Sequence, residues 1–439
     1  MKRRCIVSIS VAVLLFMIKT VPATVWYVHP DSALNSIQAG IDSCVNGDTV
    51  LVGPGTYTEN INFNGMAITV QSEYGADTTI IDGGSPTNPD SGSVVTCASG
   101  EDITSVLCGF KIINGSGTYV PAFGFLGGGI YCNNSAPTIK ENVIIDNGSS
   151  KILAGGGVEC DENSSPIIID NVIKHNEAEF GGGVECYYAS PTIHNNTIDS
   201  NMADWGGGIS YSYGGPSDIV DNHIRWNTAD SIGGGILCDN NSINIIGNVI
   251  SHNTAERYGG GIRCWLSSAI IKHNIITDNT ASIGYGGGGI RCQQSATPSI
   301  DSCVIANNNG DGIYCWTAAD PEIHYCNITG NVGYGVVNTY SYLTIDAEFN
   351  WWGDPSGPGG VGPGSGDSVS DYVDFDPWLQ DSVQGIGIQE LRITKTCILN
   401  LHVAPNPFCY RTVIQYSITN SQFVAQDPTI RIYDATGRL

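Results

Sequence analysis

Two arginines at equivalent positions of a repeated motif are the first residues whose types and spacing could do chemistry. Arg263 and Arg291 each follow Gly-Gly-Ile and precede Cys, in a chain with only 18 Lys and Arg against 42 Asp and Glu. A guanidinium can pair with a carboxylate through two parallel hydrogen bonds. Trp and Tyr recur at neighbouring motif positions, and aromatic faces can stack on sugar rings. This combination favours recognition of an acidic carbohydrate.

The motif recurs at a nearly constant interval. Its last glycine returns in steps of 23 to 28 residues, at Gly129, Gly157, Gly183, Gly208, Gly235, Gly261, Gly289 and, in two degenerate copies, Gly312 and Gly335. A period of this size indicates a stack of similar structural units. A second block, Ile-x-x-Asn-x-Ile-x-x-Asn, follows in each unit. Its short apolar runs between Gly, Pro, Asn and Ser indicate strands rather than helices.

Three short strands per coil, about 25 residues per coil and parallel stacking describe an all-β fold, the right-handed parallel β-helix. One coil cannot bury its apolar side alone, but stacked coils form a continuous core. The glycines then let the chain turn at the start of a strand without a Cβ clash. A phosphate-binding loop is the rival interpretation, and it fails because no helix follows. Asn142 and its equivalents form a corner column whose amides can bond along the stack.

Alternation along a strand separates inward from outward residues of the motif. In Gly-Ile-x-Cys, Ile and Cys point inward, whereas x and the residue after Cys point outward. Seven cysteines share the inward position: Cys132, Cys160, Cys186, Cys238, Cys264, Cys292 and Cys315. Stacked side chains lie about 4.8 Å apart, whereas disulfide-bonded Cβ atoms lie about 3.8 Å apart. We expect buried free thiols that pack the core, with a metal site as the alternative.

The outward positions form one face of the predicted stack. The first column is Tyr131, Glu159, Glu185, Ser210, Leu237, Arg263, Arg291 and Tyr314, and the second is Asn133, Asp161, Tyr187, Ser212, Asp239, Trp265, Gln293 and Trp316. We expect this face to be a ligand groove, and the alternative is an ordinary solvated face of mixed charge.

Each candidate in the predicted groove has a role that its chemistry suggests. Arg263 and Arg291 are candidate catalytic bases. The candidate substrate-binding residues are Tyr187, Trp265, Tyr314, Trp316, Glu159 and Glu185. Asp161 and Asp239 are candidate oxygen ligands for a calcium ion.

The two ends of the chain differ from the repeats. Residues 1–23 combine a basic start, a short apolar run and small residues, which predicts a secretory signal peptide. We assign residues 24–380 to the β-helix, with 24–95 as N-terminal cap and first coils, 96–348 as repeat coils and 349–380 as C-terminal cap. Leu34, Ile37, Ile41 and Cys44 share one helical face, which predicts a helix over the open end of the stack. Residues 381–398 are assigned to a linker, and 399–439 to part of a small β-sandwich.

Several segments resemble known families. The stretch "SIQAGIDSCVNGDTVLVGPGTYTENINF", the Gly-Gly-Gly-Ile-x-Cys coils and "NWWGDPSGP" are similar to the pectate-lyase-like right-handed β-helix repeat proteins of bacteria, over about residues 24 to 380. The C-terminal "APNPF" and "IRIYDATGRL" resemble the Ig-like sorting modules of exported bacterial proteins, here incomplete. The first resemblance implies the fold but no single activity, because this scaffold serves lyases, hydrolases, epimerases and proteins without known chemistry.

Charge and composition limit the classes of partner that the protein can bind. A formal net charge of -24 gives no general attraction for nucleic acid or an anionic membrane, and no segment after the signal is long and apolar enough to span a bilayer. We therefore expect an exported, monomeric protein, secreted or on the outer cell surface, whose partner is a polysaccharide.

Two functions remain open for such a protein. The first is binding of extended polysaccharide along one face of the solenoid. The second is enzymatic: a polysaccharide lyase needs a base and neutralisation of the uronate carboxylate, and a glycoside hydrolase needs two carboxylates about 5 to 9 Å apart.

Overall fold

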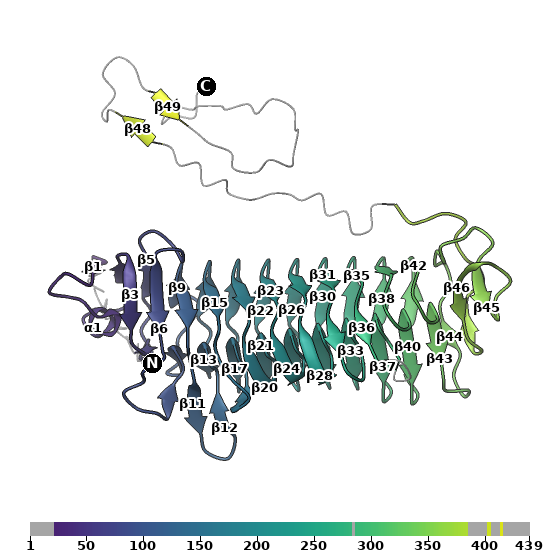
Figure 1. Cartoon of the computed structure of the whole chain (residues 1–439), viewed down its shortest axis with the longest axis horizontal. Helices are drawn as coiled ribbons and strands as arrows, with labels where there is room; N and C mark the ends of the chain where they lie inside the picture. Colours follow the sequence, from purple (N-terminus) through teal and green to yellow (C-terminus); the bar gives the residue numbers. More distant parts are fainter. Residues whose placement is uncertain (1–21, 283–285, 385–401, 405–412, 416–439) are drawn as a thin grey trace, which may run out of the picture. The chain divides into compact units, whose positions relative to one another are not determined.

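The computed structural model describes residues 22–282, 286–384, 402–404 and 413–415. The chain divides into two units, Met1–Gly387 and Ile388–Leu439. The first is a stack of parallel strands with one short helix among its described residues (Figure 1). In the second, β48 (His402–Ala404) pairs antiparallel with β49 (Val413–Gln415). The predicted signal segment, apart from its last two residues, and most of the predicted linker and sorting module lie outside the described residues.

Each middle coil contains four strands. In one coil β14 (Thr138–Lys140), β15 (Val143–Ile145), β16 (Ile152–Ala154) and β17 (Val158–Asp161) follow one another. Each pairs in parallel with its equivalent in the next coil. The equivalents build three long sheets, here A, B and C, of 14, 11 and 13 strands, and a shorter sheet D of 9 strands. The predicted all-β parallel β-helix is confirmed, with sheets A, B and C as its three faces and sheet D as an addition to the middle coils.

The strands of each sheet are given in their spatial order. Sheet A contains β1 (Val25–Val28), β2 (Thr49–Val52), β5 (Thr69–Ser72), β9 (Val106–Cys108), β14, β18 (Ile167–Ile169), β22 (Thr192–His194), β26 (Asp218–Val220), β30 (Asn244–Ile246), β34 (Ile270–Lys272), β38 (Ser299–Asp301), β41 (Glu322–His324), β44 (Ile345–Asp346) and β47 (Val373–Asp374). Sheet B contains β3 (Gly55–Thr58), β6 (Thr79–Asp82), β10 (Lys111–Ile113), β15, β19 (Val172–Lys174), β23 (Thr197–Asp199), β27 (His223–Arg225), β31 (Val249–Ser251), β35 (Ile275–Thr277), β39 (Val304–Ala306) and β42 (Asn327–Thr329).

The other two sheets build the face that holds the candidate residues. Sheet C contains β4 (Ile61–Asn62), β8 (Val95–Cys97), β13 (Ile130–Asn133), β17, β21 (Val184–Tyr187), β25 (Ile209–Ser212), β29 (Ile236–Asp239), β33 (Ile262–Trp265), β37 (Ile290–Gln293), β40 (Ile313–Trp316), β43 (Val336–Asn338), β46 (Gly366–Val369) and β45 (Pro358–Gly360). Sheet D contains β36 (Thr280–Ala281), β32 (Thr254–Ala255), β28 (Thr228–Ile232), β24 (Met202–Trp205), β20 (Glu177–Phe180), β16, β12 (Gly124–Leu126), β11 (Gly117–Val120) and β7 (Ser91–Gly92).

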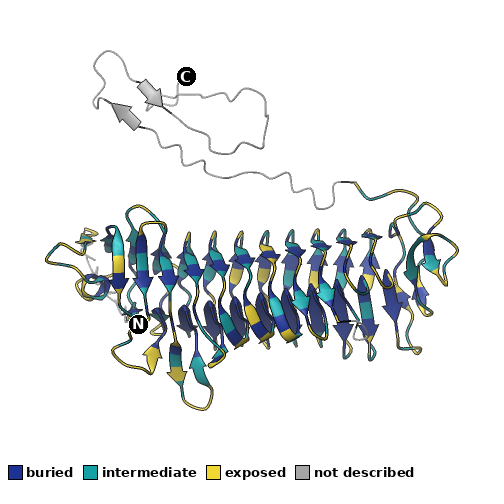
Figure 2. Ribbon diagram, in the orientation of Figure 1, coloured by how far each residue is buried: buried dark blue, intermediate teal, exposed yellow. Residues whose placement is uncertain are grey.

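The inward residues of the repeated motif build the hydrophobic core. The Ile or Val and the Cys of each Gly-Ile-x-Cys copy, such as Ile130 with Cys132 and Ile262 with Cys264, are fully buried, and the strands are largely dark blue in Figure 2. The twelve cysteines of the described residues are all free, and only Cys108 is not buried. The inward direction of Ile and Cys is therefore confirmed, and the thiols lie among apolar side chains as core residues do.

Two asparagine ladders tie the coils together at their corners. In the first, Asn142, Asn171, Asn196, Asn222 and Asn248 each donate an amide hydrogen bond of 3.0 to 3.1 Å to the Oδ1 of the next coil's Asn. The second runs in the same way from Asn147 and ends where Asn331 donates to Asp367 at 2.9 Å. The left-handed residue of the first corner precedes the asparagine, as at Glu141 (φ 57) and Asp170 (φ 57). The asparagines therefore serve mainly as hydrogen-bonding groups.

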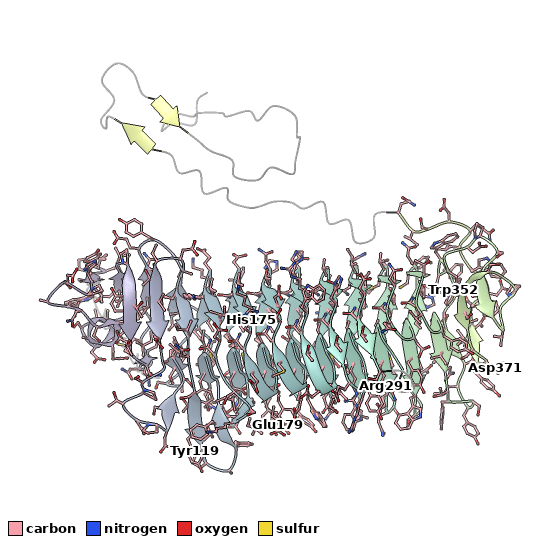
Figure 3. The ribbon with its side chains drawn as sticks, viewed as in Figure 1. Tyr119, His175, Glu179, Arg291, Trp352 and Asp371 are labelled. Carbon is pink, nitrogen blue, oxygen red and sulfur yellow. The ribbon has the colours of Figure 1, made fainter. Side chains whose placement is uncertain are left out.

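Both ends of the stack are covered. The helix α1 (Ile37–Asp42) lies over the first coil and buries Ile37 and Ile41, as the apolar face of the sequence predicts. At the other end Trp352 is fully buried and Trp378 packs against the core, and Figure 3 labels Trp352 there. These caps leave the long faces of the stack as the places where a ligand can bind.

Candidate functional site

The first glycine of each Gly-Gly-Gly run folds sheet D over sheet C. Gly155 has φ +66, and a Cβ built on it would lie 2.6 Å from both Cα and Cβ of Glu159. Gly181 and Gly259 repeat this contact against Glu185 and Arg263. Only glycine tolerates both the positive φ and this approach. The glycine run therefore brings one strand over the outward side chain of the next.

The residue before each glycine run forms a wall along this overlap. Parallel pairing places Ala154 beside Phe180, Phe180 beside Trp205, and Trp205 beside Ile232, and a bridge continues the column to Tyr258. Phe180 and Trp205 contact each other, with ring centroids 5.6 Å apart. This column is not among the residues predicted from the sequence, although the same counting by motif position identifies it.

The wall covers the first outward column, which is therefore not the ordinary solvated face that was the alternative to a ligand groove. Glu159 is 1% exposed, and Glu185, Arg263 and Arg291 are each 3% exposed. Their side chains do point away from the core, but sheet D covers them. The second column is less covered and reaches 41% exposure at Trp316. The strip of sheet C that carries the two columns, together with the wall of sheet D, is here called the C–D groove, and an open cavity lies over its first part.

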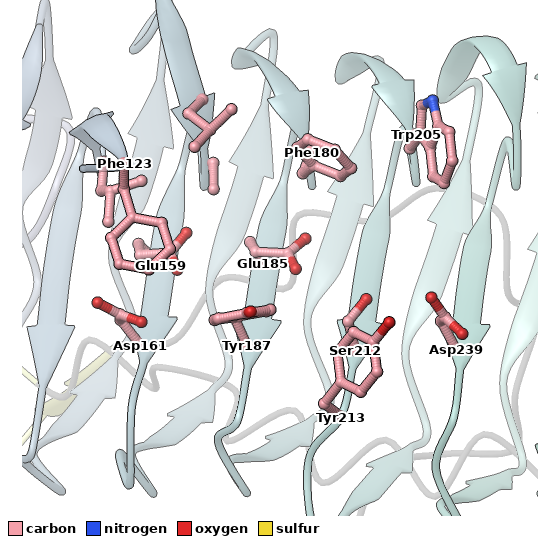
Figure 4. A pocket seen from close by; sticks show the side chains of 13 residues that line it. Phe123, Glu159, Asp161, Phe180, Glu185, Tyr187, Trp205, Ser212, Tyr213 and Asp239 are labelled. Atoms are coloured by element: carbon pink, nitrogen blue, oxygen red, sulfur yellow. The ribbon is translucent and has the colours of Figure 1, made fainter.

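The first part of the C–D groove is an acidic cavity of about 320 Å³ (Figure 4). Its floor carries Glu159, Asp161, Glu185, Tyr187 and Asp239, and its wall includes Leu153, Phe180 and Trp205. Phe123, from the turn between β12 and the antiparallel β11, closes one side, with its ring centroid 6.4 Å from that of Tyr187. The cavity therefore combines carboxyl groups with an aromatic wall.

Burial sets the protonation of the two glutamates. It raises the pKa of Glu159 well above its usual range, and the neighbouring Glu185 and Asp161 raise it further. Burial likewise raises the pKa of Glu185 to about 8, with the nearby Ser210 hydroxyl opposing the effect and Asp239 and Asp161 adding to it. Asp161 is held by Tyr131 Oη, which donates at 3.2 Å, and by Asn133 Nδ2 at 3.1 Å. At neutral pH the cavity floor therefore offers protonated carboxyl groups beside hydrogen-bonded Asp161.

The second part of the groove is a stack of arginines and aromatic rings. The Cζ of Arg263 lies 4.6 Å from the ring centroid of Trp265, and that of Arg291 lies 4.1 and 4.6 Å from the centroids of Tyr258 and Tyr314. Trp316 also contacts Arg291, at 5.5 Å. Such cation–π contacts hold the guanidinium planes in place. Tyr258 belongs to the wall, so the same two sheets build this stack and the acidic cavity.

The arginine stack carries buried positive charge. Arg263 Nη2 and Arg291 Nε both donate to Gln293 Oε1, at 3.3 Å. Burial lowers the pKa of Arg263 to about 10, and the adjacent Arg291 contributes. A pKa of this size leaves Arg263 protonated at neutral pH. Because the two guanidinium groups repel each other in a poorly hydrated place, an anion between or beside them would relieve that repulsion.

Buried polar atoms without a hydrogen-bond partner are concentrated in the C–D groove. Seven such side-chain atoms occur among the described residues, and six of them lie here: Glu159 Oε2, Glu185 Oε2, Ser210 Oγ, Arg263 Nε, Arg263 Nη1 and Trp265 Nε1. Each costs free energy, because a buried donor or acceptor has given up water. Their concentration in one groove indicates groups that a bound molecule would satisfy.

The expected calcium ligands do not lie together. The register places Asp161 and Asp239 three coils apart, which is about 14 Å at the usual strand spacing. This separation is too long for one ion with ligands at about 2.4 Å. Among the residues that the structure describes, no group of three or more His, Cys, Asp or Glu side chains could hold a metal ion.

The predicted site residues thus fall into two clusters of one groove. Glu159, Asp161, Glu185, Tyr187 and Asp239 line the acidic cavity, whereas Arg263, Arg291, Trp265, Tyr314 and Trp316 form the arginine stack. The residues that sequence reasoning missed are those of the wall and the turn, namely Phe123, Phe180, Trp205 and Tyr258. Phe123 lies outside the repeat and leaves no periodic signal.

The fold and this groove define a right-handed β-helix protein with a covered, two-part groove. In agreement, the family model described as "Right handed beta helix region" matches residues 55–224 and 214–350, and the chain belongs to that family. A search of curated proteins found no match.

Solved structures resemble the chain in fold alone. The Dettilon tailspike protein is 14% identical, with a TM-score of 0.48 over 79% of this chain and 68% of its own. A pectate lyase is 14% identical, with a TM-score of 0.40 over 94% of each chain. The catalytic unit of a thermostable alpha-1,3-glucanase from Streptomyces thermodiastaticus is 13% identical, with a TM-score of 0.33 over 78% of this chain and 66% of its own. In the part of the chain that the structure describes, no helix has the length and apolarity needed to cross a membrane.

Proposed function

We propose that the C–D groove binds an extended, acid-containing polysaccharide, with Arg263, Arg291, Trp265 and Trp316 at its centre. The observation that carries the proposal is the concentration of buried polar atoms without partners along this one groove. Sugar hydroxyl and carboxylate groups supply both the acceptors that Arg263 and Trp265 lack and the hydrogen bonds that the glutamates lack. The aromatic wall supplies faces for sugar rings.

The arginine stack is the feature that selects an acidic ligand. Two guanidinium groups on adjacent strands are buried, and Nε and Nη1 of Arg263 have no hydrogen-bond partner. A carboxylate accepts bidentate hydrogen bonds from such a group. A bound carboxylate would therefore both satisfy these donors and reduce the repulsion between the two cations.

The double substitution Arg263→Ala and Trp316→Ala tests this function. We expect wild-type protein to be retained by at least one of four gels that contain polygalacturonate, alginate, hyaluronan or gellan. The double variant should bind that polymer at least about tenfold more weakly, a loss of about 1.4 kcal/mol. Its matched control is Arg225→Ala with Trp226→Ala, the same residue types in exposed positions on and beside sheet B. Wild type that runs freely through all four gels, or a double variant retained as well as wild type, would remove the groove from consideration.

Cleavage of the polysaccharide is the second candidate function, and the buried glutamate pair favours it. A carboxyl group whose pKa is raised by an apolar site can act as general acid toward a glycosidic oxygen, and one other carboxyl group must be ionised to act as base or nucleophile, so this activity should rise as the pH approaches the Glu185 pKa of about 8. Glu159 and Glu185 lie on adjacent strands of one cavity. The alternative is a lyase in which Arg263 or Arg291 removes a proton, and its rate should rise with pH because a guanidinium must first lose its own proton.

Two product assays separate these activities. Hydrolysis releases new reducing ends without ultraviolet absorbance, whereas elimination also produces an unsaturated uronate that absorbs. A hydrolase should lose activity in Glu159→Gln and Glu185→Gln, and a lyase in Arg263→Lys or Arg291→Lys. A full set of negative results with polymers that the protein retains would leave binding as its function.

Export is part of the same proposal. A protein that binds extended polysaccharide acts where such polymers occur, outside the cell, and residues 1–23 have the pattern of a secretory signal. Expression of the full sequence in a secreting bacterium should yield extracellular protein whose first residue is Thr24. Protein that stays in the cytoplasm with residues 1–23 attached would contradict export.

A further inference from the structure

The charge along the C–D groove changes sign. The coils from β17 to β29 carry Glu159, Asp161, Glu185 and Asp239 on the groove floor, and no Lys or Arg occupies the floor positions of these coils. The next two coils carry Arg263 and Arg291 at the same positions. Because parallel strands are about 4.8 Å apart, Glu185 and Arg263 are separated by about 14 Å along the stack.

The acidic cavity is suited to an uncharged sugar. Glu159 and Glu185 are buried, and each has an oxygen without a hydrogen-bond partner. A protonated carboxyl group both donates and accepts, so it matches hydroxyl groups well. A ligand carboxylate in the same place would lose its water beside an apolar wall and further acidic side chains, with no cation on the floor of these coils, which is unfavourable.

The arginine stack has the opposite requirement. Nε and Nη1 of Arg263 are buried donors without acceptors, and Trp265 Nε1 is a third. A neutral sugar would bring no negative charge to the two guanidinium groups, whereas a carboxylate or a sulfate would bring one and could accept hydrogen bonds from Arg263. The two parts of the groove therefore favour different sugars. These sugars would bind a fixed number of coils apart.

From this juxtaposition we infer that the ligand is a mixed polysaccharide, in which an anionic sugar at Arg263 and Arg291 is joined to uncharged sugars at Glu159 and Glu185. The inference rests on the proposed function of the groove and goes further, because it excludes polymers with an acidic group on every residue as the best ligands. The sequence alone points only to acidic carbohydrate. The exclusion comes from the burial of the glutamates beneath sheet D.

Affinity electrophoresis of the full chain in gels with five polymers tests the inference. Polygalacturonate and alginate carry a carboxylate on every sugar, hyaluronan and gellan carry one on every second or every fourth sugar, and dextran carries none. We expect at least one of the two mixed polymers to bind at least tenfold more tightly than either uniformly acidic one, and dextran to bind most weakly.

The double variant Glu159→Gln with Glu185→Gln tests whether these two acidic groups cause the weaker binding of uniformly acidic polymers. Removing both ionisable groups should raise the affinity for polygalacturonate or alginate several-fold relative to the affinity for the mixed polymer, because only the uniform polymer places a carboxylate beside them. Glu179→Gln, an exposed glutamate on sheet D, is the matched control and should change neither affinity.

The outcomes distinguish this inference from the proposed function. Polygalacturonate or alginate bound as tightly as the mixed polymers, with no gain in the double glutamine variant, would overturn the mixed-ligand inference and leave the groove as a binding site. Failure to bind any acidic polymer would overturn both. Dextran bound as tightly as the mixed polymers would show that the arginine stack has no role in recognition.

Discussion

At the scale of single residues, the groove holds ionisable groups in surroundings that disfavour their charge. Two glutamates and two arginines are almost fully buried beneath sheet D, and several of their polar atoms have no partner. Buried charges of this kind seldom stabilise a fold, and replacing them by apolar residues is often neutral or favourable. Stability therefore does not account for these groups, whereas the proposed ligand site would give them a role.

The glutamate pair should make stability depend on pH. The folded chain holds the Glu185 proton up to about pH 8, whereas a carboxyl with the ordinary pKa of 4.5 loses it earlier. The unfolded state therefore binds fewer protons in this window, and stability falls as pH rises through it. The variant Glu185→Gln should be more stable than wild type near pH 8, by a few kcal/mol at most, with the difference shrinking toward pH 4.5.

Thermal melts followed by circular dichroism across this pH range measure the effect. Glu179→Gln, which alters an exposed side chain, is the control and should follow the wild-type curve. Parallel curves for wild type and Glu185→Gln would show that Glu185 is ionised in the folded protein near neutral pH.

The core thiols should be chemically silent in the folded protein. Of the twelve cysteines described, eleven are buried and none is paired in a disulfide. The neighbouring thiol of the column, together with burial, raises the pKa of several, including Cys160 and Cys238. Both effects suppress the reactive thiolate. A thiol reagent should label these cysteines only after denaturation, and mass spectrometry that finds most of them in disulfides would contradict this.

At the scale of elements, each coil corner depends on a ladder asparagine. Asn222 donates to Asn248 Oδ1 at 3.0 Å and to the Ile193 carbonyl oxygen at 2.9 Å, and its own Oδ1 accepts from the backbone and side chain of Asn196. All of these groups are buried, so loss of the side chain leaves several without a partner.

Substitution of Asn222 should therefore be costly. Because each buried polar group left unsatisfied costs about 1 to 3 kcal/mol, Asn222→Ala should destabilise the protein by about 3 kcal/mol or more. The control is Asn244→Ala, which removes one exposed side-chain bond to Asp218. Urea or thermal unfolding measures both variants, and equal midpoints would show that the ladder amides contribute little.

Sheet D is the element that turns a β-helix face into a groove. It owes its place to the first glycine of each run, since a Cβ at Gly155 or Gly259 would overlap the next strand. The other glycines of the run lie against neighbouring coils: a Cβ on Gly157 would lie 2.5 Å from the carbonyl oxygen of Gly183. One sequence motif thus serves both coil stacking and the cover over the site.

At the scale of the whole molecule, the first unit contains its own continuous core. This core runs from Val28 to Val373 and includes both end caps. The boundary between the two units lies after Gly387. A unit with a complete core and covered ends has what it needs to fold alone.

A fragment of residues 24–384 should therefore behave like the full chain. We expect the same melting temperature, measured by circular dichroism, and the same affinity for any polymer that the full chain binds, measured by affinity electrophoresis. The isolated segment after residue 385 should show no cooperative unfolding, because about 50 residues bury too little apolar surface for a stable core. A fragment 24–384 that aggregates or melts much earlier would show that the β-helix depends on the second unit.

The sequence by itself determined the period, the strand type and the direction of each side chain in the motif. These follow from local rules: a strand alternates its side chains, and stacked repeats bring equal letters together, so Ile130 and Cys132 had to be inside and Glu159 and Arg263 outside. The end caps follow as well, since the apolar face of α1 and Trp352 need a partner surface.

Only the tertiary structure decided what happens to the outward side chains. Whether Glu159 and Arg263 meet water depends on the path of β16 and β32, which a positive φ at Gly155 and Gly259 bends back over the sheet. That bend removes water from the outward glutamates and arginines and so shifts their pKa values. The residues Phe123, Phe180 and Tyr258 reach the groove from a turn and from other segments of the coils. The register of the parallel strands of sheet C separates Asp161 from Asp239 by three coils. It also places the acidic cavity and the arginine stack one after the other along the same groove. Burial and distance arise from contacts between segments far apart in the sequence, so no local pattern contains them.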